Sequence, residues 1–101
     1  MKLISNSLVY VHVRLDTNEI FYVGISTNNK RPYEKKCHSD RWEKVVKKAG
    51  YKVKIIIKDI TWERACKIEK LLIYKYGRLD LGTGILVNMT DGGEGTPNRI
   101  L

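Results

Sequence analysis

Apolar and polar positions alternate along residues 8–26, on both sides of the polar stretch Asp16, Thr17, Asn18 and Glu19. A period of two places successive side chains on opposite faces of a β-strand. Two such runs separated by a short polar segment are typical of an antiparallel hairpin. The pattern therefore predicts two strands joined by a tight turn within these residues.

The apolar residues of this hairpin predict its register. Its valines, its phenylalanine and Ile25 all have odd numbers: Val9, Val11, Val13, Phe21, Val23 and Ile25. A three-residue turn centred on Thr17 pairs positions of equal parity and places the whole set on one face. A four-residue turn would leave about half of the set in water, at roughly 1.5–3 kcal/mol each. We therefore expect the odd positions to face the core and the opposite face to carry Tyr10, His12, Tyr22 and Gly24.

The middle of the chain carries further elements. Residues 40–49 have apolar residues at helical spacing and precede Gly50, which predicts a helix with a C-terminal stop. Residues 51–59 alternate and then run apolar, which predicts a third strand that is central in the sheet and partly covered on both faces. A short helical turn is expected at residues 31–36, where Pro32 is tolerated in the first turn.

The clearest helical pattern follows Thr61, a residue type that caps helices. Its apolar positions recur at intervals of three and four and end before Gly77: Trp62, Ala65, Ile68, Leu72, Ile73 and Tyr76. The segment after Gly77 is rich in turn formers, so we expect a loop with a brief ordered element near Leu86. Together these patterns predict a small sheet mixed with helices.

The size and composition of the chain fit one domain over residues 1–101. The sequence has 101 residues and is 43% hydrophobic, which is ordinary for a folded protein. No apolar run approaches the roughly 18 residues needed to span a bilayer, so no membrane partner is expected. Cys37 and Cys66 have neither CxxC nor metal-finger spacing and follow no signal-like leader. We therefore expect free thiols and a cytoplasmic location.

The net charge of +8 is concentrated in one part of the chain. Residues 30–58 hold eleven of the nineteen Lys and Arg residues but three of the eleven acidic residues. A basic surface attracts polyanions, nucleic acid first, through phosphate contacts and counterion release. The alternative is a lysine-rich surface that only keeps the protein soluble. The candidate nucleic-acid-binding residues are Lys30, Lys36, Arg41, Lys44, Lys47 and Lys48.

Glu69 lies inside the apolar stripe of the second predicted helix, four residues after Ala65 and four before Ile73. A carboxylate on a buried face needs a cation, hydrogen-bond donors or a metal ion. An internal ion pair is one explanation. A Mg²⁺ site is the other, because Mg²⁺ keeps most of its waters and takes few protein ligands. Zinc and thiol catalysis are disfavoured, since His and Cys residues lack useful spacing and sequence neighbours such as Cys37 and His38 usually point apart.

Several short motifs occur in a defined order: Tyr10 within VYV, YVG at residues 22–24, Arg31, Glu69 within IEKLLI, Asn88 within LVN, and DGGEG at residues 91–95. In this order and spacing the chain resembles the GIY-YIG nuclease family over nearly its whole length, and most of all its small phage and mobile-element members, which include homing endonucleases. The resemblance implies an α+β fold with a small three-stranded antiparallel sheet flanked by helices. It also implies an endonuclease that hydrolyses DNA phosphodiester bonds with Mg²⁺ or Mn²⁺, in a bacterial or phage-infected host cell.

The resemblance also implies a role for each motif residue. Tyr10 corresponds to the tyrosine that takes or relays the proton of the attacking water, and Tyr22 to the one that orients water or contacts the phosphate. Arg31 corresponds to the arginine that stabilises phosphate charge, Glu69 to the sole metal-ligating carboxylate, and Asn88 to a supporting asparagine. A phenol with a pKa of about 10 is a poor base at neutral pH, so a metal ion or Arg31 must favour the phenolate.

Some features depart from the family pattern or leave alternatives open. The first motif reads LVY at residues 8–10, where the family name has GIY. The family often places His, Tyr or Lys one helical turn beyond the arginine, so the candidates to assist catalysis there are Lys35, Tyr33, His38 and, from the tyrosine face, His12.

The alternative function is a nucleic-acid-binding module that has the same fold and does not cut. A structural partner protein would leave the charge asymmetry and the tyrosine face unexplained. Double-strand cleavage by so small a domain implies a transient homodimer.

Overall fold

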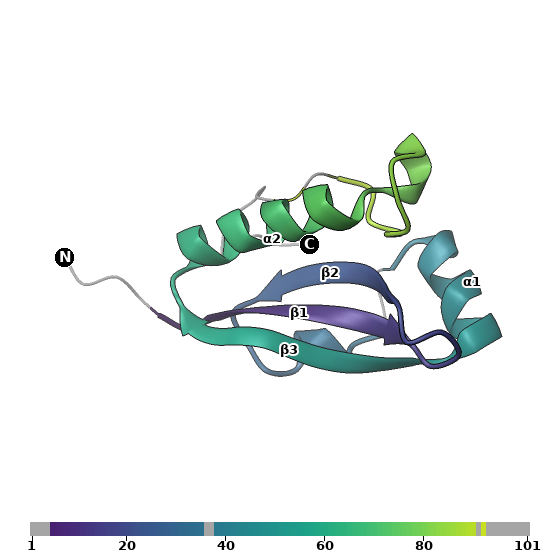
Figure 1. Ribbon diagram of the computed structural model, residues 1–101. Helices are drawn as coiled ribbons and strands as arrows, with labels where there is room; N and C mark the ends of the chain where they lie inside the picture. Colours follow the sequence, from purple (N-terminus) through teal and green to yellow (C-terminus); the bar gives the residue numbers. More distant parts are fainter. Residues whose placement is uncertain (1–4, 36–37, 91, 93–101) are drawn as a thin grey trace.

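The computed structural model describes residues 5–35, 38–90 and 92. Over these residues the chain forms a small α+β fold with one three-stranded antiparallel sheet and two α-helices, as predicted (Figure 1). In chain order the elements are β1 (Ser7–Arg14), β2 (Ile20–Ser26), the 3₁₀ turn η1 (Arg31–Tyr33), α1 (Asp40–Ala49), β3 (Tyr51–Ile60), α2 (Trp62–Tyr76) and the 3₁₀ turn η2 (Leu79–Leu81).

The sheet has the order β2-β1-β3, so β1 is the central strand. The prediction that β3 is central is therefore wrong. The exposed fractions of Ile55 and Ile56 in β3 are 37% and 42%. Isoleucine fits the pleated surface of any strand, so a run of isoleucines reports strand propensity as well as burial. The valine-rich strand β1 holds the centre instead.

The β1–β2 hairpin has the register that its apolar pattern predicts. Val9 faces Ile25 and Val11 faces Val23. A β-bulge after His12 then shifts the ladder, so that Val13 faces Ile20 rather than Phe21. The odd-numbered residues accordingly share one core, with the exception of Phe21, which packs in a second cluster.

Two hydrophobic clusters hold the helices on the sheet. The larger one joins the valines of β1 and β2 to Ala65 and Ile73 of α2, which lies along one face of the sheet (Figure 1). The smaller one joins Phe21 to Trp42 of α1 and to Val87. Helix α1 lies at the end of the sheet next to the β1–β2 turn (Figure 1). The candidate site forms beside strand β2, between the middle of α2 and the start of α1.

Both helices begin and end at the residues that the sequence predicts. Ser39 Oγ accepts a hydrogen bond from the backbone N–H of Trp42, and Thr61 Oγ1 accepts one from Arg64. Gly50 and Gly77 end the helices with φ angles of 70° and 75°. The ordered element expected near Leu86 is also present, as a parallel bridge between Leu86 and Arg78. None of the helices in the described ranges is long and apolar enough to cross a membrane.

Candidate active site

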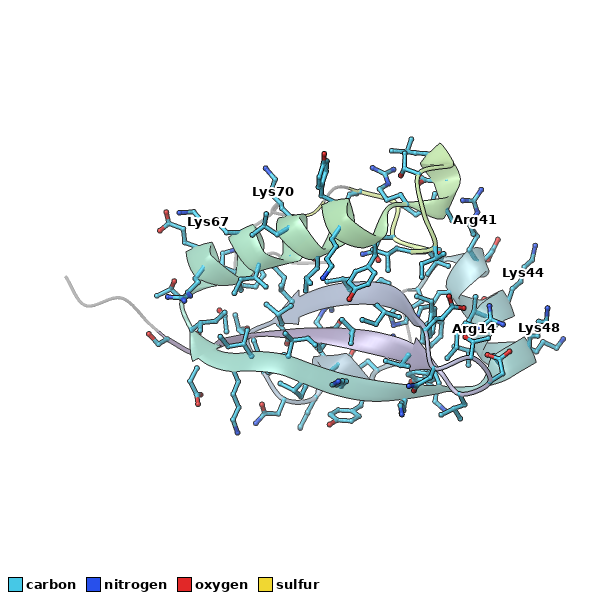
Figure 2. All side chains as sticks on the ribbon, viewed as in Figure 1. Arg14, Arg41, Lys44, Lys48, Lys67 and Lys70 are labelled. Carbon is cyan, nitrogen blue, oxygen red and sulfur yellow. The ribbon has the colours of Figure 1, made fainter. Side chains whose placement is uncertain are left out.

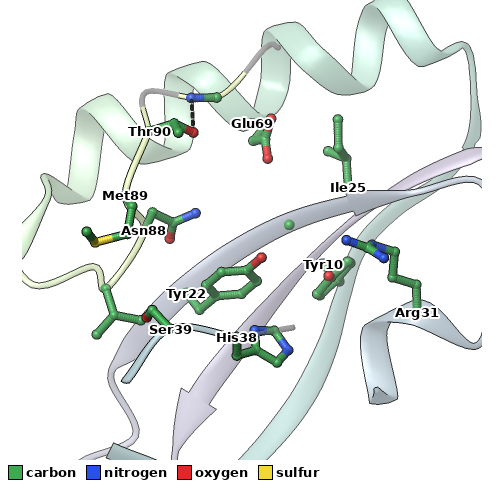
Figure 3. A pocket seen from close by; sticks show the side chains of 13 residues that line it. Tyr10, Tyr22, Ile25, Arg31, His38, Ser39, Glu69, Asn88, Met89 and Thr90 are labelled. Atoms are coloured by element: carbon green, nitrogen blue, oxygen red, sulfur yellow. Dashed lines mark hydrogen bonds between the residues drawn. The ribbon is translucent and has the colours of Figure 1, made fainter. Parts of the chain in front are cut away.

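A pocket beside strand β2 collects polar side chains from four separate elements (Figure 3). Tyr10 enters from β1, Tyr22 from β2, Arg31 from η1 and Glu69 from α2. Asn88, His38 and Ser39 complete much of its polar lining. The residues with the strongest sequence signals therefore meet in one place, although they are spread over most of the chain.

Tyr10 and Tyr22 lie side by side, with ring centroids 6.3 Å apart. Tyr10 belongs to the central strand and faces Gly24 of the edge strand. A Cβ atom at position 24 would lie 2.5 Å from the Tyr10 hydroxyl oxygen, too close for any side chain. Glycine at this position therefore allows the Tyr10 ring to cross the edge strand and reach the pocket.

The environment keeps Tyr10 protonated at neutral pH. Burial is the main cause that raises the pKa of the Tyr10 hydroxyl, and Tyr22 raises it further by charge repulsion and hydrogen bonding. Arg31 lowers the pKa of Tyr10, and Glu69 raises it. The balance is a pKa well above the usual tyrosine value. Arg31 alone therefore does not create the phenolate that a general base requires.

Arg31 projects from a turn that is held at both ends, and its guanidinium points towards Tyr10 (Figure 3). Asn28 Oδ1 accepts hydrogen bonds from the backbone N–H groups of Lys30 and Arg31, at 2.9 and 2.8 Å. Pro32 restricts the backbone at the next position, and its carbonyl oxygen lies 2.8 Å from His12 Nε2. The guanidinium is thus presented from a braced turn rather than from a free loop.

Glu69 is half-buried on α2 and points into the pocket (Figure 3). The backbone of Gly92 lies close to it, since a Cβ there would be 3.0 Å from Glu69 Oε1. Within the described ranges, no group of three or more His, Cys, Asp or Glu side chains is arranged to hold a metal ion. One carboxylate beside an open polar pocket fits Mg²⁺, which needs few protein ligands. It does not fit a zinc or calcium cage.

Asn88 holds the outer edge of β2. Its Oδ1 accepts the backbone N–H of Val23 at 3.0 Å, and its Nδ2 donates to the Val23 carbonyl at 2.8 Å. The amide thereby supplies the donor and the acceptor that a neighbouring strand would offer. Asn88 lines the pocket, but its amide group supports the strand that carries Tyr22.

His38 lines the pocket, between Trp42 and Tyr22. Its ring stacks on Trp42 at 3.9 Å between centroids and meets Tyr22 edge-on at 5.2 Å. Nε2 lies 3.0 Å from the Glu34 carbonyl oxygen and so carries the proton, which leaves a lone pair on Nδ1. Burial lowers the pKa of His38, so the ring is neutral at neutral pH.

His12 shares a sheet face with the tyrosines, but it lies beneath the pocket and does not line it. It is fully buried, and the protein occupies both ring nitrogens. Trp42 Nε1 donates to Nδ1 at 2.9 Å, and Nε2 lies 2.8 Å from the Pro32 carbonyl oxygen. No ring nitrogen of His12 is left to bind a substrate. We therefore assign His12 a supporting role instead of the catalytic role expected from its position on the face of the tyrosines.

The other expected residues lie outside the pocket. Lys35 and Tyr33 are exposed and do not line it. Most of the proposed nucleic-acid-binding residues are exposed on the surface: Lys30, Arg41, Lys44, Lys47 and Lys48. Lys36, Cys37 and most of the DGGEG motif, residues 91 and 93–95, fall outside the described residues.

The supporting roles of two residues were not predicted from the sequence. Asn28 organises the turn that carries Arg31, and Trp42 orients His12. The Asn28 signal was present, since asparagine often accepts hydrogen bonds from backbone N–H groups two or three residues later. Trp42 looks like an ordinary apolar helix residue, because its indole partner lies 30 residues away.

No family model matches the chain, and neither a curated protein nor a solved structure does so. The function proposed for the chain therefore rests on its own residues and on their geometry.

Proposed function

We propose that this chain is a Mg²⁺-dependent DNA endonuclease of the GIY-YIG type, which hydrolyses a phosphodiester bond in the pocket beside β2. The observation that carries the proposal is the convergence of Tyr10, Tyr22, Arg31 and Glu69 from four elements. Packing alone does not require two phenols, a guanidinium and a carboxylate to meet at an accessible pocket. Convergent polar groups with a perturbed pKa are characteristic of catalytic sites.

Arg31 and the pocket hydroxyls recognise the scissile phosphate. A guanidinium binds two phosphate oxygens at once and stabilises the charge that develops on them in the transition state. The braced turn keeps Arg31 in place before the substrate arrives. Pre-organised charge is more effective than charge that must move during the reaction.

The tyrosines and His38 manage the attacking water. A water oxygen forms the new bond to phosphorus while the bond to the leaving oxygen breaks, and the leaving oxygen takes up a proton from a solvent water. Protonated Tyr10 acts as a hydrogen-bond donor, so Tyr10 and Tyr22 orient the water. His38 is neutral and has a lone pair on Nδ1, so it accepts the proton that the water loses.

Glu69 is the residue that would hold Mg²⁺ in this site, with waters and substrate oxygens filling the other positions. The ion would supply Lewis-acid stabilisation of negative charge on the phosphate and on the leaving oxygen. Asn88 keeps β2, and with it Tyr22, in register beneath the substrate.

One row of cations on α1 provides affinity for the DNA backbone. The helix begins just after Ser39, which lines the pocket. Arg41, Lys44 and Lys48 are exposed at spacings of three and four, so they form one row along the helix (Figure 2). The row extends over about 10 Å at 1.5 Å per residue, which is enough for two neighbouring phosphates. None of the three belongs to an ion pair within the described part of the chain.

A plasmid assay tests the proposal. The protein with Mg²⁺ is expected to nick supercoiled plasmid, and Glu69→Gln is expected to lose this activity because the amide cannot hold the ion. Glu63→Gln is the matched control, since Glu63 is an exposed carboxylate on the same helix and does not line the pocket. Equal nicking by Glu69→Gln and the wild type would overturn the proposal. A rise of linear product with protein concentration would indicate that two copies cut together.

The second candidate function is DNA binding without cleavage. The exposed cations of α1 favour it, because contacts to DNA phosphates need no catalytic base. This candidate predicts salt-dependent binding of duplex DNA by the wild type, with no Mg²⁺-dependent nicking at any protein concentration. The same plasmid and binding assays therefore separate the two functions.

A further inference from the structure

A chain of hydrogen bonds runs beneath the pocket from α1 through β1 to η1. Trp42 Nε1 donates to His12 Nδ1 at 2.9 Å, and His12 Nε2 lies 2.8 Å from the Pro32 carbonyl oxygen. His12 is 0% exposed and Trp42 is 2% exposed. Pro32 is also fully buried. Water therefore does not compete for these bonds, and each partner would be left unpaired if another were removed.

The two hydrogen bonds determine the tautomer of His12. An indole N–H can only donate, so Nδ1 of His12 accepts and carries no proton. A carbonyl oxygen can only accept, so Nε2 carries the proton and donates it to Pro32. The ring is thus neutral, with a defined orientation, and the groups facing it include the rings of Tyr10, Tyr22, His38 and Tyr51.

The carbonyl that His12 holds belongs to the residue next to Arg31. On the N-terminal side, Asn28 holds the Arg31 backbone N–H at 2.8 Å. On the C-terminal side, His12 of strand β1 holds the Pro32 carbonyl, and His38 holds the Glu34 carbonyl two residues further on. The ring of Pro32 restricts its φ angle, and the hydrogen bond from His12 fixes its carbonyl group. Together they leave little freedom to the peptide between Arg31 and Pro32.

We propose that His12, oriented by Trp42, is a positioning residue that sets the direction of Arg31 towards the phosphate through the Pro32 carbonyl. The inference rests on the proposed function for its effect on cleavage, but the positioning itself is a property of the free protein. It differs from a catalytic role for His12, because no atom of the ring reaches the pocket.

A double-mutant cycle tests whether His12 acts through Arg31. His12→Phe fills the space but removes both hydrogen bonds, and it is expected to lower single-turnover cleavage about tenfold or more, with little change in the concentration of DNA needed for half-maximal rate. In an Arg31→Ala background the same substitution is expected to change the rate less than about twofold. An equal loss in both backgrounds would show a general structural role and overturn the proposal.

Conservative variants keep the test decisive if His12→Phe folds poorly. The His12→Gln side chain can still donate an N–H to the Pro32 carbonyl, so it is expected to recover most of the rate that His12→Phe loses. Trp42→Phe removes the group that orients the ring and is expected to give an intermediate loss. A His12→Gln variant that folds but is as slow as His12→Phe would contradict the positioning role.

Nuclear magnetic resonance gives a readout that does not depend on cleavage. The ¹⁵N shifts of His12 are expected to show a protonated Nε2 and an unprotonated Nδ1 at neutral pH. In His12→Gln the backbone order parameters of Arg31 are expected to stay close to wild type, and in His12→Phe they are expected to fall. If the wild type cuts no DNA, the proposed function fails, while the Arg31 order parameters still decide whether His12 positions Arg31. Unchanged Arg31 order parameters in His12→Phe would overturn the proposal that His12 positions Arg31.

Discussion

Tyr10 and Gly24 face each other across the β1–β2 ladder, and the Tyr10 phenol occupies the space that a side chain at position 24 would need. A central-strand tyrosine can reach an edge-strand pocket because the edge residue opposite it has no Cβ. The glycine of the YVG motif thus acts on the site through Tyr10, without contributing a functional group of its own.

Gly24→Ala is therefore expected to displace Tyr10. Overpacking of this kind costs about 1–3 kcal/mol of the free energy of unfolding, and the displaced hydroxyl no longer orients water. Plasmid nicking at a temperature well below the unfolding midpoint is expected to fall at least about tenfold, because misplaced reacting groups are costly in rate.

Gly82→Ala provides the control for that substitution. Gly82 has a φ angle of 71°, and a Cβ added there would have no atom within 4 Å, so the alanine strains the backbone without touching the site. It is expected to lower the unfolding midpoint while nicking stays at the wild-type level. If Gly24→Ala nicks as fast as Gly82→Ala, the contact between Tyr10 and Gly24 has no bearing on activity.

Asn88→Ala is expected to loosen β2. The substitution leaves the buried N–H and C=O groups of Val23 without their partner, at about 1–3 kcal/mol for each unsatisfied group. Hydrogen exchange at the Val23 amide is expected to accelerate accordingly. Met89→Ala is the comparison, because Met89 is exposed at the next position. Wild-type exchange at Val23 in Asn88→Ala would contradict the assigned role.

Three of the four α1 cations are expected to bind DNA, and Lys47 is not among them. Lys47 is also exposed, but at 3.6 residues per turn its side chain points about 100° around the helix axis from that of Lys48, away from the row. Lys44→Ala and Lys48→Ala should each weaken duplex binding and reduce the slope of log K against log salt by about 0.9. Lys47→Ala should change the slope less. Binding titrations at several salt concentrations make the comparison, and equal effects at all positions would indicate a diffuse field rather than a row.

The stability of the protein is expected to fall as the pH drops from about 6.5 to about 4. Burial lowers the pKa of His12 to about 4, so the unfolded chain takes up a proton at a higher pH than the folded one. The contribution of neutral His12 to the free energy of unfolding is fully present above about pH 6.5. It is lost as the pH falls below that value, at up to about 1.4 kcal/mol per pH unit. Burial of His38 acts in the same direction.

Urea unfolding at several pH values measures this dependence. His12→Gln cannot titrate in this range, so its stability should vary less between pH 4 and 6.5 than that of the wild type. The difference between the two proteins isolates His12 from the carboxylates, which both proteins share. Parallel curves would mean that His12 is not held neutral in the folded state.

Much of the local structure was predictable because its causes lie close together in the chain. The helix α1 ends where Gly50 removes the steric cost of a positive φ angle, and α2 begins where Thr61 can cap it. The hairpin register follows from the odd-numbered apolar residues, since a shift of one residue would turn about half of them to water. These signals need no knowledge of the rest of the fold.

The errors arose where distant segments compete. Phe21 left the valine core because a bulge after His12 shifts the ladder, and the residue sequence carries no sign of that bulge. β3 reads as a buried strand, but the hairpin takes the covered centre and leaves β3 at the edge. Isoleucine favours a β-strand at the edge of a sheet as well as at its centre, so the isoleucines of β3 do not tell the two positions apart.

The residue types of the site and their order are properties of the chain alone, and they predict Tyr10, Tyr22, Arg31 and Glu69 as partners. Their chemical states depend on the folded protein. Tyr10 is protonated because segments far away in the sequence bury it, and His12 is a support because Trp42 and Pro32 occupy its nitrogens. Desolvation and hydrogen bonding act between groups that only folding brings together, so local patterns identify the groups and the tertiary structure decides what each of them can do.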